Sequence, residues 1–174
     1  MTNSSVPESI SFPKAISMTQ SLMEQISDNK LSETEIRQQI SSLLSSKNGG
    51  RGFFVAYLTS EMTLPDNPSS GIINALKSMQ DVSSELIVKN LAMSSAMIVT
   101  HERNDDAQSF IGSQKVRRRT CNLIQQLDLQ SIQEKLQRLK NTLENGKGEY
   151  QDFLQRWGYD DEQKKAIQNA IESL

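Results

Sequence analysis

The residues with the clearest chemical potential form a basic cluster in the second half of the chain. They are Lys115, Arg117, Arg118 and Arg119. On a helix, an acidic residue four positions away usually offsets such charges, but no acid lies four positions before or after any of the three arginines. The cluster predicts salt bridges to other helices, a contact with protein or nucleic acid, or, together with Arg103, a site for a small anion such as phosphate.

The only histidine, His101, stands close to three carboxylates, those of Glu102, Asp105 and Asp106. This combination could hold a divalent metal or serve as a general base. Its spacing matches neither the His-Glu-x-x-His motif nor a calcium loop. We therefore prefer a histidine near a helix C-terminus, which the helix dipole favours, followed by a solvated loop. We predict no metal site, no cofactor and no catalytic residue.

Two further motifs have simpler structural explanations. Cys121 follows Arg117 by one helical turn, which favours a thiolate, but no Cys-His pair accompanies it, and we predict a buried structural thiol. The run Gly49-Gly50-Arg51-Gly52 lacks the Gly-Lys-Ser/Thr ending of a phosphate-binding loop. We predict that it ends a helix.

Composition narrows the class of protein. The 174 residues carry 19 basic and 21 acidic side chains, a net charge of −2, and neither half has the basic surplus that nucleic-acid binding requires. No uninterrupted apolar run is long enough to span a membrane. The single cysteine, and an opening segment without a signal-peptide pattern, predict a cytosolic location.

Apolar periodicity predicts an all-α fold, an antiparallel bundle of about six to seven helices. We expect one domain over residues 11–174, preceded by a flexible tail at residues 1–10. A capping box at Ser32 and Glu35 marks a helix start, and Gly146 and Gly158 mark helix ends. Residues 51–64 remain open between strand, helix and irregular structure, although the absence of a second strand-like run disfavours a strand.

A heptad-like seam predicts one long central helix over about residues 68–101, roughly 45 Å in length. The seam residues are Ile72, Leu76, Met79, Ser83, Leu86, Asn90, Met93 and Met97. Ser83 and Asn90 are polar interruptions. They predict hydrogen bonds to a neighbouring helix, a polar pocket, or a buried stripe slightly rotated from this seam.

Two classes of function remain open. The polar helix faces, and the absence of catalytic motifs from the sequence, favour a non-catalytic interaction or scaffold protein that binds a protein partner or a second copy of itself. The alternative is an anion-binding or enzymatic bundle whose site joins His101 to Arg117–Arg119. A concave pocket between those two segments would favour the alternative, and a convex solvated face would favour the interaction protein.

Overall fold

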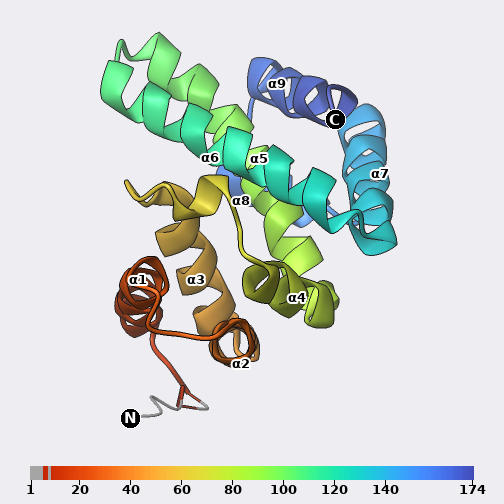
Figure 1. Ribbon diagram of the computed structural model, residues 1–174. Helices are drawn as coiled ribbons and strands as arrows, with labels where there is room; N and C mark the ends of the chain where they lie inside the picture. Colours follow the sequence, from red (N-terminus) through yellow and green to blue (C-terminus); the bar gives the residue numbers. More distant parts are fainter. Residues whose placement is uncertain (1–5, 8) are drawn as a thin grey trace. The chain divides into compact units, whose positions relative to one another are not determined.

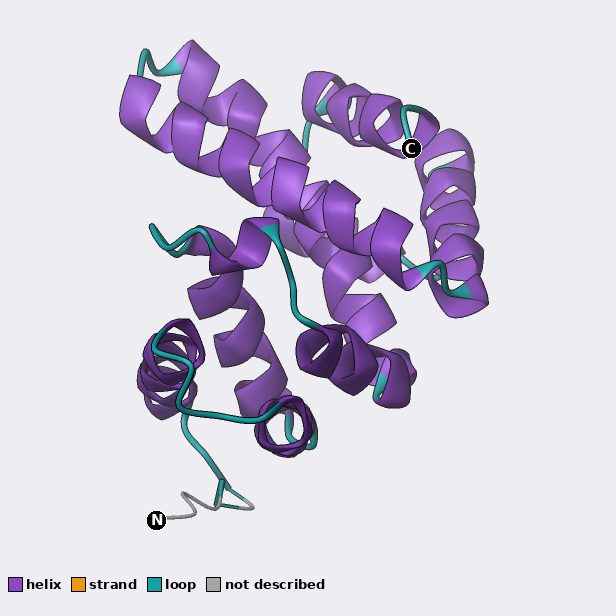
Figure 2. Ribbon diagram, in the orientation of Figure 1, coloured by secondary structure: helices purple, strands orange, loops and turns teal. Residues whose placement is uncertain are grey.

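The computed structural model describes residues 6–7 and 9–174, and the regular structure in this part of the chain is entirely helical (Figures 1 and 2). The predicted all-α fold is confirmed. The expected six to seven helices are too few, because the described residues form nine α-helices and one short 3-10 helix. Their bounds are α1 Phe12–Ser27, α2 Glu33–Leu44, α3 Lys47–Thr59, η1 Leu64–Asp66, α4 Ser70–Ser78, α5 Gln80–Arg103, α6 Ala107–Leu127, α7 Gln130–Asn145, α8 Gln151–Trp157 and α9 Asp161–Glu172.

Internal contacts divide the chain into two compact units, Met1–Leu86 and Ile87–Leu174, and the division falls inside α5. The predicted single domain over residues 11–174 stays a prediction. Most of the predicted tail, residues 1–5 and 8, lies outside the described residues. Ile10, at its end, is buried.

The first unit is organised by close packing at glycines. Gly49, Gly50 and Gly52 lie within α3, whose N-cap is Ser46, so the prediction that this run ends a helix is wrong. A Cβ atom on Gly52 would lie 2.4 Å from the Cβ of Ala15 in α1. Glycine is therefore required here by the close approach of α1 and α3, and the segment left open from residue 51 continues as helix to Thr59.

The predicted long helix over residues 68–101 is broken at Met79. Its backbone, with φ −109° and ψ 37°, separates α4 from α5. The buried Ser83 hydroxyl donates to the Leu76 carbonyl across this break, at 2.7 Å. The prediction of one continuous helix is wrong because the heptad spacing continues across the turn at Met79, and no glycine or proline marks that turn.

The break also rotates the buried face of α5 away from the predicted seam. Leu86, Asn90, Met93 and Met97 are half-buried. The fully buried side chains of this stretch lie next to them and include Ile87, Val88, Leu91, Ala92, Ser95 and Ala96. Among the described helices, α5 alone is long and apolar enough to cross a membrane by length and composition, yet more than half of that stretch is buried in the fold, as in a core helix. The expectation of no membrane span stays a prediction.

The second unit is tied together by polar contacts between helices distant in sequence. The Gln163 amide of α9 donates to the Thr100 hydroxyl of α5 at 2.9 Å. The Thr142 hydroxyl of α7 accepts from the Tyr150 amide. Left-handed residues end α7 at Gly146 and α8 at Gly158, as the sequence predicts. The Gln163–Thr100 bond holds α9 to α5 close to the end of that helix, next to the loop where the candidate site lies.

Candidate functional site

The structure separates Arg103 from the other four cations of the predicted anion site. Arg103 ends α5, and its guanidinium donates to the Asp160 carboxylate at 2.6 Å and to Glu162. These two bonds raise the pKa of Arg103 further above its ordinary value. The other four cations lie on α6, and the first of them, Lys115, lies about 12 Å along that helix from its start. Arg103 therefore serves to hold the start of α9 to the end of α5.

The four cations of α6 differ in exposure. Arg119 is buried, Lys115 and Arg117 are half-buried, and Arg118 is exposed. Lys115, Arg118 and Arg119 each have an interaction partner in the structure. The anion site itself stays a prediction.

A surface pocket of about 310 Å³ lies at the turn between α5 and α6. Its lining residues are His101, Glu102, Asp105, Asp106, Ala107 and Phe110. We call it the turn pocket. It contains the histidine and all three carboxylates that the sequence brings together around residues 101–106, but none of the arginines of α6.

Local backbone geometry fixes the carboxylates at the turn pocket. Asp106 is the N-cap of α6, and its side chain accepts from the Ser109 amide at 3.1 Å. Asp105 occupies the left-handed region with φ 52°, which Asn, Asp and Gly tolerate best. The Asp106 amide closes the turn by donating to the His101 carbonyl at 3.0 Å.

The pocket is electrostatically negative. Hydrogen bonds from Ser109 hold the pKa of Asp106 below its ordinary value, and nearby His101 lowers it further. The His101 Nδ1 atom lies 3.9 Å from an Asp106 oxygen, and the histidine side chain is only 18% exposed. Since the adjacent Arg103 pairs with Asp160 and Glu162, the turn pocket favours a cationic group.

The pocket is better suited to an organic cation than to a metal ion. Within the described residues, no group of three or more His, Cys, Asp or Glu side chains is placed to hold a metal. Metal coordination needs ligand atoms that converge to about 2.0–2.6 Å from the ion. A guanidinium or ammonium group spreads its donors and can bind carboxylates that do not converge on one point.

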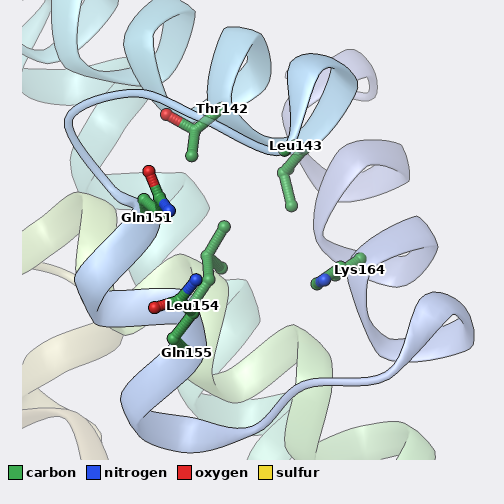
Figure 3. A pocket seen from close by; sticks show the side chains of 7 residues that line it. Thr142, Leu143, Gln151, Leu154, Gln155 and Lys164 are labelled. Carbon is green, nitrogen blue, oxygen red and sulfur yellow. The ribbon is translucent and has the colours of Figure 1, made fainter.

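A smaller cavity of about 70 Å³ lies among α7, α8 and α9. Its lining residues are Thr142, Leu143, Gly146, Gln151, Leu154, Gln155 and Lys164. Figure 3 shows the Leu143 and Leu154 side chains pointing into this space from α7 and α8, with Lys164 reaching it from α9. Its volume suits a few water molecules rather than a ligand.

Cys121 is half-buried, and burial raises the pKa of its thiol despite the opposing charge of Arg117. The thiol form is therefore favoured, as expected for a structural cysteine.

Residues 11–174 match the family model described as uncharacterised conserved protein UCP020893. The chain belongs to this family. The match begins at Ser11, the N-cap of α1, so the family segment contains every described helix and the whole turn pocket. No curated protein and no solved structure matches the chain.

Sequence reasoning found part of the turn pocket and missed the rest. It singled out His101 and the carboxylates because of their residue types. Ala107 and Phe110 were missed because they become pocket walls only through the first turn of α6, which begins at Ala107 directly after its N-cap Asp106. The signal that could have located them is Asp106 itself, an N-cap residue three positions before Ser109.

Proposed function

We propose that this family member is a non-catalytic interaction protein of the cytosol, and that its turn pocket binds a cationic side chain of a partner protein. The observation that carries the proposal is an open surface pocket lined by Glu102, Asp105 and Asp106 together with Phe110. The carboxylates supply charge, and the phenyl ring supplies a flat apolar surface on which a guanidinium can stack.

The exposed apolar surface beside the pocket supports binding to a protein rather than to a small cation. Ile111, the residue after Phe110, is 63% exposed. An apolar side chain next to a charged pocket is typical of the mixed composition of protein interfaces. A free metabolite would gain nothing from Ile111, whereas a partner helix or loop could cover it while its arginine or lysine enters the pocket.

The test compares an arginine-containing peptide with a peptide of the same sequence in which citrulline, uncharged and nearly isosteric, replaces arginine. Backbone amide shifts measured by NMR should change around residues 101–111 with the arginine peptide, and the binding should weaken as salt is added. Equal shifts with the citrulline peptide would contradict the proposal.

A matched pair of variants locates the binding. Glu102→Gln combined with Asp105→Asn removes two pocket charges without disturbing the N-cap Asp106, and asparagine suits the left-handed backbone of residue 105. The control, Glu134→Gln combined with Glu144→Gln, makes the same charge change at exposed positions of α7. We expect roughly tenfold weaker peptide binding for the first variant only. A loss of equal size in both would point to net charge and not to the pocket.

A further inference from the structure

Helix α6 carries an exposed line of side chains that begins at the turn pocket. Ala107, Ile111, Gln114 and Arg118 are all exposed, at alternating spacings of four and three residues. This spacing places them on one side of the helix, as in helices that pair along a seam. Ile111 lies inside the line and is more exposed than Trp157, the next most exposed large apolar side chain among the described residues, at 53%.

The two ends of this line have opposite charge. The Ala107 end adjoins the acidic turn pocket. The other end carries Arg118, with Arg117 beside it. A partner helix that runs antiparallel with the same sequence would therefore bring each basic end to an acidic end, whereas a parallel arrangement would bring like charges together.

The spacing fixes the register of such a pair. With a two-fold axis midway between Ile111 and Gln114, Ile111 of each copy faces Gln114 of the other. Arg118 then lies opposite Ala107, which lines the turn pocket, and Arg117 lies opposite Gln108. The contact is self-complementary, as two-fold interfaces are, and it sets each Arg118 guanidinium beside the acidic turn pocket of the other copy.

We infer that the partner of the turn pocket is a second copy of this chain. The two α6 helices pair antiparallel through Ile111, and Arg118 of each copy enters the acidic pocket of the other. This inference rests on the proposed function, because it names the source of the cationic side chain.

Sedimentation equilibrium of the full chain tests the inference. We expect a concentration-dependent dimer that dissociates as ionic strength rises. Ile111→Ser, at an exposed position where the fold loses little, should raise the dimer Kd roughly tenfold or more. Wild-type protein that stays monomeric up to about 1 mM would overturn the inference.

A charge swap tests the register. Arg118→Glu alone and Glu102→Lys alone should each weaken dimerisation, because each variant sets like charges opposite each other in both contacts. In an equimolar mixture, a heterodimer of the two variants has two opposite-charge contacts. The mixture should therefore dimerise more tightly than either variant alone. Failure of the mixture to associate, with both variants folded by circular dichroism, would overturn the proposed pairing.

The peptide titration separates this inference from the proposed function. Monomeric wild type that still binds the arginine peptide at residues 101–111 would overturn only the self-association and point to a different protein as partner. Wild type that stays monomeric and also fails to bind the arginine peptide would overturn both the self-association and the proposed function.

Discussion

Two buried serines of α5 differ in their hydrogen bonds. The Ser83 hydroxyl donates to the Leu76 carbonyl across the break between α4 and α5. The equally buried Ser95 hydroxyl has no hydrogen-bond partner among the described residues. Ser83→Ala should therefore lower the free energy of unfolding by about 1–2 kcal/mol, since the carbonyl loses its partner, whereas Ser95→Ala should leave it unchanged or raise it. Urea denaturation of both variants measures this, and equal losses would contradict the assignment.

Two helical glycines form a second residue-scale contrast. Gly52→Ala would place a methyl group 2.4 Å from the Ala15 Cβ atom, and overpacking of this kind costs about 1–3 kcal/mol. A Cβ atom on Gly112 of α6 would meet nothing within 4 Å. Since glycine inside a helix is less stable than alanine by about 0.5–1 kcal/mol, Gly112→Ala should stabilise the protein by that amount. Thermal unfolding should shift in opposite directions for the two variants. A shift of the same sign in both would show that backbone entropy, and not the α1–α3 contact, determines the response at Gly52.

At the scale of elements, the start of α9 should depend on pH through Asp160. This residue caps α9 and accepts from Arg103, and these bonds lower the pKa of Asp160 from its ordinary value of 3.8 to about 2. A lowered pKa in the folded state means that the stabilisation is complete above about pH 4 and is lost as the pH falls toward 2.

Asp160→Asn isolates that charge, because asparagine is an equally good N-cap residue. Its melting temperature should lie below that of wild type at pH 6, and the two should converge as the pH approaches 2. Glu144→Gln, an exposed substitution on α7, is the control and should stay parallel to wild type across the range. A gap that persists at pH 2 would mean that the loss comes from capping geometry and not from the carboxylate charge.

The helix ends were predictable where a few neighbouring residues determine them. The capping box of Ser32 and Glu35 forms as predicted, with the Ser32 amide donating to the Glu35 carboxylate at 2.8 Å. The glycines at 146 and 158 end their helices through left-handed backbone that their own residue type allows. Signals of this kind lie within one helical turn, so the sequence displays them directly.

Two of the incorrect predictions concern features that no signal within their own segment marks. The glycines of α3 resemble a helix stop, because nothing in their own segment shows that Ala15 needs the space. The break at Met79 lacks a local signal, because the Ser83 hydroxyl that accompanies it lies in the following helix.

The candidate site was predictable only where its residues are neighbours in the sequence. The histidine and carboxylates of residues 101–106 are close in sequence, and their residue types indicated a candidate site. The partners of Arg103, however, lie more than fifty residues away, at Asp160 and Glu162. Sequence alone therefore assigned Arg103 to an anion site.

At the scale of the whole molecule, unfolding should be cooperative although contacts divide the chain into two units. The boundary falls between Leu86 and Ile87, inside the continuous helix α5, so loss of either unit removes the packing of part of that helix. Leu44→Ala in the first unit should cost about 2–5 kcal/mol, because Leu44 is fully buried. Fluorescence of Trp157, the single tryptophan, reports the second unit, and circular dichroism reports both. Both transitions should shift together in this variant. A shift in circular dichroism alone would show that the units unfold independently.

The position of that boundary has a practical consequence for anyone who wishes to cut the protein into pieces. Most multidomain chains can be divided at a flexible linker, and each fragment then keeps its own helices whole. A cut at the boundary here would leave the N-terminal fragment with about two turns of α5, too short to persist as a helix in water without its packing. The C-terminal fragment would begin with a frayed end where its own core should start. Split-protein reassembly should therefore succeed best with a cut at the loop of residues 60–69 or at the turn after Arg103, which leave α5 intact.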